Sequence, residues 1–437
     1  EAFADYGAEN VESTFRSCYA GKEEHGSVRL PRSAGGKGRR EADEANKPAE
    51  VEAIEAFLFS QAEFRHNVIT HHCEIRWTEE AGFLPLTDRD VNTLWGRMNK
   101  TVGRVYLTDI YNVIHSEFVP LFNPFQSYFD HLPSWDGVSD PIGDLADTVH
   151  VKSDQAEFRD YFRKWFVGIL PALLDDTVVN HEILVLIGEQ GLYKTTWFNF
   201  LLPPELRCYF YTKTNSDRLN KDDLFSLTEF ALICFEELDG MRPAELNQLK
   251  AMVTMPYVNE RAAYGRNKER HPHIASFCGT GNNVQFLTDP TGNRRWLPFE
   301  VSQIRDPHQH AIPYELVYSQ AYALWKSGFC HWFSQEEIRK LNMHNSRFEV
   351  PNLEEDLIRT HFRKPFEGEA GIFVTAADIL EQISSCLRYP LSPNKIGRIM
   401  AGLEFESIRH RGKRGYIAVK KTGEDIDRER RSGALGL

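Results

Sequence analysis

Long hydrophobic runs and paired cysteines are both missing from this chain of 437 residues. No apolar stretch approaches the roughly 20 residues that a membrane helix needs, and no signal peptide is recognisable. The 7 cysteines are scattered, none at the spacing of a zinc site, and several lie in apolar runs. We therefore expect a cytoplasmic protein with reduced thiols and no membrane partner.

An excess of positive charge is also missing, because 51 Lys and Arg face 63 Asp and Glu, for a net charge of −12. This balance argues against a protein that coats nucleic acid over its whole surface, but it leaves local basic patches open. The hydrophobic content of 41% is ample for packed domains, and the length predicts two or three of them. The chain starts at Glu1, so we expect a fragment that a further domain precedes.

Apolar runs and helical patterns alternate through the middle of the chain. A stripe of large apolar side chains over residues 154–174 predicts a buried helix. Strands that alternate with helices predict an α/β fold with a largely parallel, covered sheet. Nearer the start, we expect a helix, then strands at 67–70 and 73–77, then a helix capped by Asp88. The four runs that predict buried strands are 183–187, 230–235, 274–278 and 296–301.

A Gly-rich turn follows the first of these buried strands and precedes a helix. Backbone N–H groups exposed by glycine, a helix N-terminus, a lysine and a hydroxyl are the groups that phosphates and Mg²⁺ require. The turn therefore predicts a P-loop for a nucleotide, and a strand-to-helix turn with chance Gly and Lys is the alternative. Tyr193 stands where a second Gly is usual, which predicts a backbone that avoids positive φ there. The expected binding residues are Gly188, Glu189, Gln190, Gly191, Lys194, Thr195 and Thr196.

Carboxylates and an asparagine follow the next two buried strands. Glu236 and Glu237 end the second strand, where one acid can hold Mg²⁺ and its neighbour can polarise the attacking water. Which acid has which role stays open, with Thr195 and Glu236 as the expected metal ligands, and solvated carboxylates are the alternative. Asn282 follows the third strand, which we expect to lie between the other two, so its amide could reach the γ-phosphate; an ordinary Asn-Gly turn is the alternative.

Positive charge concentrates in three places. Arg294 and Arg295 precede the fourth strand and suit an arginine finger that a neighbouring subunit supplies, although structural salt bridges would explain either Arg alone. The segment 261–273 is basic and could contact DNA through Arg266, Lys268 and Arg270, although a solvated hairpin is about as plausible. Residues 370–421 hold nine Lys and Arg against four Asp and Glu, with Lys413, Arg414 and Tyr416 as expected DNA contacts.

The last of these segments has the pattern of a winged helix. It consists of a helix at 376–387, a turn, a helix at 394–403 and a hairpin containing Gly412 and Gly415. A winged module that binds only protein is the alternative. The expected segments of the chain are a leader helix and flexible linker (1–50), an N-terminal α+β region (51–150), a P-loop ATPase core (151–335), a helical connector (336–369), a winged-helix-like module (370–421) and a charged, frayed tail (422–437).

In this order, the motifs resemble the virulence-associated protein E family, which groups with superfamily 3 helicases and is common on phages, plasmids and integrated islands. The resemblance covers about residues 55–300. The combined order is specific, whereas each piece alone is not. The motifs that carry it are Tyr128–Gly137, Gly188–Gly191, Glu237–Gly240, Leu249-Lys250, Tyr264–Arg266, Thr280–Asn282, Phe286–Asp289 and Gly292–Arg295.

The resemblance implies a P-loop NTPase core of the AAA+ or superfamily 3 type, which binds ATP and Mg²⁺, assembles into a homo-oligomeric ring and moves on DNA, often beside a primase domain. The family's loop lysine and hydroxyl fall on Lys194 and Thr195, and its finger falls on Arg294 or Arg295. We expect a helicase-like motor on single-stranded DNA in replication of a mobile element. The alternative is a nucleotide-switched DNA-binding regulator or defence protein with little or no unwinding activity.

Overall fold

The computed structural model describes residues 49–214, 221–260, 269–288, 293–350, 353–366, 368–384 and 392–431. These residues form two compact units, one ending at Leu121 and the other running from Phe122, with Val68–Thr70 belonging to the second. None of the helices in the described ranges is both long enough and apolar enough to cross a membrane.

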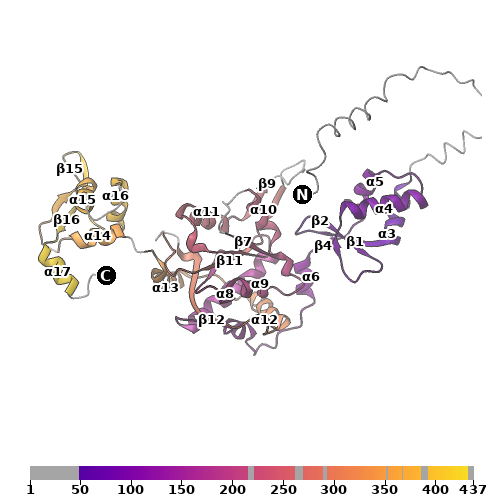
Figure 1. The fold of residues 1–437 in the computed structure, drawn as a ribbon, viewed down its shortest axis with the longest axis horizontal. Helices are drawn as coiled ribbons and strands as arrows, with labels where there is room; N and C mark the ends of the chain where they lie inside the picture. The colour runs from indigo at the N-terminus through magenta and orange to yellow at the C-terminus, as the bar shows by residue number, and fades with distance from the viewer. Residues whose placement is uncertain are drawn as a thin grey trace, which may run out of the picture. The chain divides into compact units, whose positions relative to one another are not determined.

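The first unit packs helices against a small sheet (Figure 1). That sheet has four strands in the order β3-β2-β1-β4. Its core contains Ile54, Leu58 and Ile75. The strand expected at 67–70 is wrong, because the strand ends at Asn67 and a turn follows. The expected cap is also wrong, since the hydroxyl of Thr87 accepts the Asp90 N–H. The elements are α3 (Val51–Gln61), β1 (Ala62–Asn67), β2 (His72–Trp77), β3 (Leu84–Pro85), α4 (Asp88–Thr101), α5 (Leu107–Ile114) and β4 (Leu121–Phe122).

The second unit is built around a six-stranded sheet with the order β5-β12-β6-β11-β8-β7. All neighbouring strands run parallel except β5 and β12, which confirms the largely parallel sheet. The four expected strands are present, with shifts of a few residues at their ends. The strands are β5 (Val149–Val151), β6 (Ile183–Ile187), β7 (Phe210–Lys213), β8 (Leu232–Phe235), β11 (Ser276–Gly281) and β12 (Trp296–Ile304).

Helices cover both faces of this sheet (Figure 1). Leu184 and Leu186 of β6 pack with α8 and α9 on one face, and Val185 packs with α11 on the other. Each fully buried side chain of this size contributes about 1.5–3 kcal/mol, so both covers are needed for an uninterrupted apolar strand. The helices are α6 (Pro124–Asp130), α7 (Pro141–Ala146), α8 (Gln155–Leu174), α9 (Lys194–Leu201), α10 (Lys221–Glu229), α11 (Pro243–Val253), α12 (Tyr314–Lys326) and α13 (Gln335–Asn345), and β9 (Tyr257–Glu260) pairs with β10 (Glu269–Pro272).

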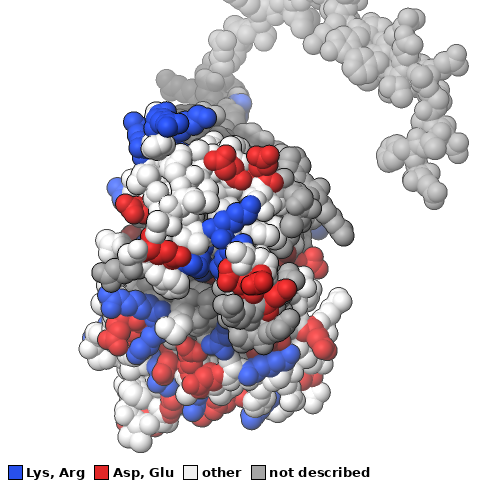
Figure 2. Space-filling view, turned by 90° about the vertical axis from the view of Figure 1, so that its left-hand side faces the viewer, with Lys and Arg blue, Asp and Glu red and all other residues white. Residues whose placement is uncertain are grey.

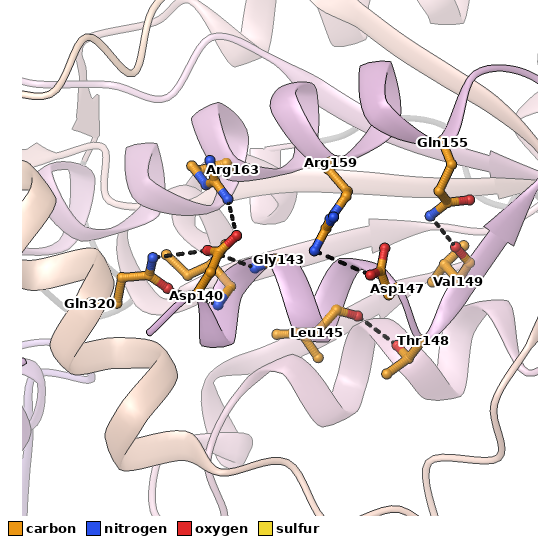
Figure 3. Close-up of polar contacts among 11 residues, drawn as sticks. Asp140, Gly143, Leu145, Asp147, Thr148, Val149, Gln155, Arg159, Arg163 and Gln320 are labelled. Atoms are coloured by element: carbon orange, nitrogen blue, oxygen red, sulfur yellow. Dashed lines mark hydrogen bonds and ion pairs between the residues drawn. The ribbon is translucent and has the colours of Figure 1, made fainter. Parts of the chain in front are cut away.

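A polar network fastens the segment before α8 to the rest of this unit (Figure 3). Asp140 accepts hydrogen bonds from the Gly143 N–H at 3.2 Å and from Gln320 Nε2 at 2.9 Å, and it pairs with Arg163. The hydroxyl of Thr148 accepts a bond of 2.8 Å from the Trp197 indole on α9. Helix α9, which follows the Gly-rich turn, is therefore hydrogen-bonded to the segment that precedes α8.

The residues from 353 onward have their own core, which includes Ile358, Ile379 and Met400. That core begins before residue 370, the boundary expected from the sequence, because α14 contributes to it. The expected helices and hairpin are present in the described part, while 385–391 lie outside it. The elements are α14 (Leu353–His361), β13 (Phe362–Arg363), β14 (Ile372–Val374), α15 (Ala376–Ser384), α16 (Pro393–Gly402), β15 (Ser407–His410), β16 (Lys413–Lys420) and α17 (Gly423–Arg431).

The expected hairpin is present and contains both of its glycines. It turns at Arg411 and Gly412, both with positive φ, and Gly415 lies inside β16. A Cβ at Gly415 would come within 2.5 Å of the Phe373 ring, so this glycine serves packing rather than the turn. The expected frayed tail contains helix α17, whose first turn is capped by Thr422 and Asp425.

Candidate active site

A cavity of about 440 Å³ lies at the carboxyl ends of β6, β8 and β11. Because these strands are parallel neighbours, the segments that follow them meet at one edge of the sheet. Strand β11 lies between β6 and β8, as expected from the sequence. The cavity is lined by Gln190, Gly191, Leu192, Tyr193, Lys194, Thr195, Thr196, Glu236, Glu237, Thr280, Gly281 and Asn282.

The Gly-rich turn begins at a tightly packed glycine. A Cβ at Gly188 would lie 2.9 Å from the carbonyl oxygen of Val301, and the Gly188 N–H donates to Gly281 O at 3.1 Å. Lys194, the first residue of α9, is 8% exposed. Its Nζ donates to the carbonyl oxygens of Gly188 at 2.6 Å and Glu189 at 2.8 Å. Burial lowers the pKa of Lys194, and the charge of Asp239 opposes that shift.

Tyr193 adopts the backbone conformation that the sequence argument excluded. Its φ of 59° and ψ of 18° are left-handed. This region costs a non-Gly residue roughly 1–2 kcal/mol, so it is reachable when the surrounding fold stabilises it. Here the Tyr193 carbonyl accepts the Trp197 N–H at 2.7 Å and so starts α9. Tyr193 as a whole is 43% exposed, and it is one of the residues that line the cavity.

The two glutamates that follow β8 differ in their contacts and in their exposure. Glu236 Oε1 accepts a hydrogen bond of 2.8 Å from the Thr195 hydroxyl, which joins the acid strand to helix α9. Glu237 is exposed, lines the cavity and has a left-handed backbone with φ of 53°. A hydroxyl and a carboxylate in contact are oxygen ligands of the kind that Mg²⁺ takes together with phosphate oxygens and water.

The loop after β11 is fixed by an acid that sequence reasoning did not include among the site residues. Asp239 accepts hydrogen bonds from the backbone N–H groups of Asn282 and Asn283, both at 3.1 Å. Asn283 Nδ2 adds a third bond at 2.7 Å. Asn282 Oδ1 in turn lies 3.4 Å from Lys194 Nζ.

The two candidate finger arginines lie away from this cavity in their own chain. Arg294 and Arg295 belong to a short 3₁₀ turn that precedes β12, at the amino end of the sheet. Trp296 is level with Ile183 at the start of β6, whereas the cavity lies beyond the end of β6. The structure therefore does not bring these arginines to Lys194 of the same chain.

The surroundings of the finger turn are partly buried. Burial lowers the pKa of Arg295, and the charge of exposed Arg294 lowers it further. Burial also raises the pKa of Glu182 to about 7, against the positive charges of Lys164 and Arg295. The turn itself is held by Asn345, whose Nδ2 donates to Asn293 O at 2.8 Å and to Trp296 O at 3.0 Å.

Among the expected DNA contacts, Arg266 and Lys268 lie outside the described residues. Arg270 on β10 is exposed, and its guanidinium lies 3.7 Å from the centre of the Tyr257 ring. The β15–β16 hairpin carries exposed Lys413 and Arg414, and Figure 2 shows blue side chains gathered at one edge of the face that it displays.

Tyr416 is a correction to the expected DNA contacts. It is 4% exposed within the core of its module, and its hydroxyl donates to Gly397 O at 3.0 Å. The alternation of side chains along β16 places Tyr416 inward, so its ring is not available to a nucleic acid.

Comparisons with known proteins match the middle of the chain to one family. Residues 130–350 match the model of the virulence-associated protein E-like domain. No curated protein matches the chain. One similar solved structure is the apo structure of the NrS-1 C terminal region (305-718), with a TM-score of 0.44 and 11% identity, covering 85% of this chain and 99% of that one. The A form apo structure of the same region has a TM-score of 0.44 and 12% identity, with coverage of 85% and 99%.

Proposed function

Since the chain belongs to the virulence-associated protein E-like domain family, we propose that it is a P-loop ATPase that acts as a helicase-like motor in replication of a phage, plasmid or integrated element. The observation that carries this proposal is the contact of 2.8 Å between Thr195 and Glu236, with buried Lys194 beside it. It joins a Gly-rich loop, a helix start and an acid-ended strand at one cavity, which is the combination that nucleotide hydrolysis needs.

The loop and the start of α9 would bind the triphosphate. Lys194 Nζ donates to two carbonyl oxygens of the loop, and phosphate oxygens can replace these carbonyls as its acceptors. Backbone N–H groups at the helix start favour negative charge in the same place. Thr195 and Glu236 would hold Mg²⁺, which offsets the phosphate charge when bound.

Glu237 and Asn282 would act on the attacking water. Glu237 is exposed to the cavity, so its carboxylate can accept the proton that water releases. Asn282 lies next to Lys194 and can orient that water or contact the outer phosphate. Arg294 or Arg295 would come from a neighbouring subunit, because neither lies at the cavity of its own chain. The active form would therefore be a ring of identical chains.

DNA would be contacted by exposed basic side chains, with single-stranded DNA as the proposed partner. Arg409, Arg411, Lys413 and Arg414 are all exposed on one hairpin, and cations in such numbers bind phosphates with a strong dependence on salt. Arg270 on β10 is a second contact of this kind. A primase domain in the same protein would supply the companion activity.

The direct test is the rate of ATP hydrolysis with and without single-stranded DNA. We expect DNA to stimulate the wild-type rate and Lys194→Ala to abolish it. Lys340→Ala is the matched control, because that side chain is 68% exposed and its ion pair in the described part of the chain is with Glu336 on its own helix. Hydrolysis at the wild-type rate by Lys194→Ala would reject the mechanism.

A second candidate is a nucleotide-switched DNA-binding regulator. The observation that favours it is Tyr193, whose ring and left-handed backbone stand at the mouth of the phosphate loop. This candidate predicts duplex binding without unwinding and hydrolysis that is slow with every DNA tested.

A further inference from the structure

We propose that Asp239 is a positioning residue that sets Asn282 at the outer phosphate, an inference that rests on the proposed nucleotide site. The carboxylate lies in the 3₁₀ turn Leu238–Gly240, which follows the acid strand β8. It reaches across to the loop that follows β11 and holds that loop by its backbone. Asp239 therefore connects the glutamates on one strand to the asparagine on the next.

Two glycines on β11 allow this close approach. A Cβ at Gly279 would lie 2.2 Å from a methyl carbon of Leu238, which is itself 1% exposed. A Cβ at Gly281 would lie 3.1 Å from Asp239 Oδ1. Both positions therefore need a residue without a side chain, because the turn Leu238–Gly240 packs directly on the end of β11.

The bonding of the carboxylate favours positioning over metal binding. Asp239 Oδ1 accepts the Asn282 N–H, and Oδ2 accepts both the Asn283 N–H and Asn283 Nδ2. Three of the roughly four lone-pair sites of a carboxylate are thus used by N–H donors. Glu236, by contrast, accepts a hydrogen bond from the Thr195 hydroxyl, so its carboxylate lies beside a second oxygen that Mg²⁺ could bind.

The consequence for chemistry lies at the amide of Asn282. Its Oδ1 lies 3.4 Å from Lys194 Nζ, so the two side chains share the region where an outer phosphate would sit. Because the backbone N–H groups of Asn282 and Asn283 both donate to Asp239, the stretch of main chain that carries this amide is held in place. Misplacing such a group by about 1 Å can cost about 100-fold in rate.

The experiment compares Asp239→Asn with the wild-type chain. Affinity is measured for magnesium ADP and for a magnesium complex of a non-hydrolysable ATP analogue, and kcat and KM are measured for ATP. We expect kcat to fall about 10- to 100-fold, with ADP affinity unchanged within about twofold. Asp306→Asn is the matched control, because Asp306 also accepts from one backbone N–H and one side-chain amide, both at 2.9 Å, outside the site.

A double-mutant cycle separates positioning from general stability. In an Asn282→Ala background, Asp239→Asn should lower kcat by less than about twofold, because the residue through which it acts is gone. Additive losses, or an equal loss of ADP affinity, would overturn the inference. Should Asp239→Asn fail to fold, Asn283→Ala removes only the bond of 2.7 Å and should lower kcat in the same direction.

The binding measurements also distinguish this inference from the proposed function. A wild-type chain that binds both nucleotides without hydrolysis would reject the ATPase. In that case Asp239→Asn should still reduce the preference for triphosphate over diphosphate, and an unchanged preference would overturn the inference. A wild-type chain that binds neither nucleotide would overturn both.

Discussion

At the scale of single residues, the candidate site contains two residues with a left-handed backbone conformation, each in a segment that follows a strand. Tyr193 and Glu237 both have φ above 50° although neither is glycine. Such strain persists only where surrounding contacts hold it, and it is concentrated at functional sites. Both residues line the same cavity, so the strain coincides with the chemistry proposed for it.

Replacing Tyr193 tests that strain. Tyr193→Gly should keep the free energy of unfolding or raise it by up to about 1 kcal/mol, because glycine adopts positive φ freely. Tyr193→Val should lower it by about 1–2 kcal/mol, since a β-branched residue tolerates this region poorly. Urea unfolding measures both, and Tyr193→Ala controls for loss of the ring. Equal stability of the glycine and valine variants would contradict the strained backbone.

His273 gives a prediction for the effect of pH. It is 1% exposed, its Nδ1 contacts Met255 O at 2.6 Å, and burial lowers its pKa to about 4. The unfolded chain takes up a proton near pH 6.5 and the folded chain does not, so stability should fall as the pH drops from about 6.5 to about 4, by about 3 kcal/mol in total. Above pH 6.5 this residue should have no effect.

Urea unfolding at pH 7 and pH 5 checks this prediction with His273→Phe. The variant should lose less stability between the two pH values than the wild-type chain does. An identical loss in both chains would show that other groups cause the pH dependence.

At the scale of elements, the sequence predicted most of what positions the site. The strand β6 was recognisable because all five of its residues are buried apolar side chains, and the acids of β8 followed from their place after a second such run. Asp239 was missed because its partners lie 43 and 44 residues later, and no local pattern marks that contact. The spaced glycines Gly279 and Gly281 are the signal that could have found it.

The errors have equally local causes. The run at 67–70 is apolar enough for a strand, but the register of β1 with β2 ends at Asn67 opposite His72. Tyr416 lies in a basic stretch, yet a two-residue alternation in β16 turns it into the core. Which face of a strand is buried depends on what packs there, and a sequence pattern of this length does not fix it.

The turn before β12 also depends on a distant element. Asn345 is fully buried on α13 and donates to two carbonyl oxygens of this turn. Asn345→Ala should lower the free energy of unfolding by about 2–4 kcal/mol, because both carbonyls lose their donor in a buried setting. Asn342→Ala, exposed on the same helix, should change it by less than about 0.5 kcal/mol. Urea unfolding measures the free energy of unfolding of both variants. A similar loss of stability in the two would contradict the role of Asn345 in holding this turn.

At the scale of the whole molecule, the proposed function requires more than one chain per site. The cavity and the arginine turn lie at opposite ends of one largely parallel sheet, so the proposed mechanism would take the arginine from a second chain. The sequence pattern predicted Arg294 and Arg295 as candidate finger residues. It could not show that they lie far from the cavity of their own chain, because that distance follows from the directions of the strands.

Mixing inactive variants tests the shared site. Lys194→Ala and the inactive one of Arg294→Ala and Arg295→Ala should each lack ATPase activity. When the two are mixed, some interfaces combine an intact loop with an intact finger, so part of the activity should return. No recovery, or a monomer mass with nucleotide bound, would make the arginines structural.

The central claim is that the turn between β6 and α9 binds a triphosphate in spite of Tyr193. Equilibrium titration of the wild-type chain with magnesium ATP, beside Lys194→Ala, measures this most directly. The account predicts saturable binding by the wild-type chain and at least about a 100-fold weaker affinity for the variant, as expected for the loss of a buried charged phosphate contact worth about 3 kcal/mol. Absence of binding by the wild-type chain, or equal affinity of the two chains, would contradict it.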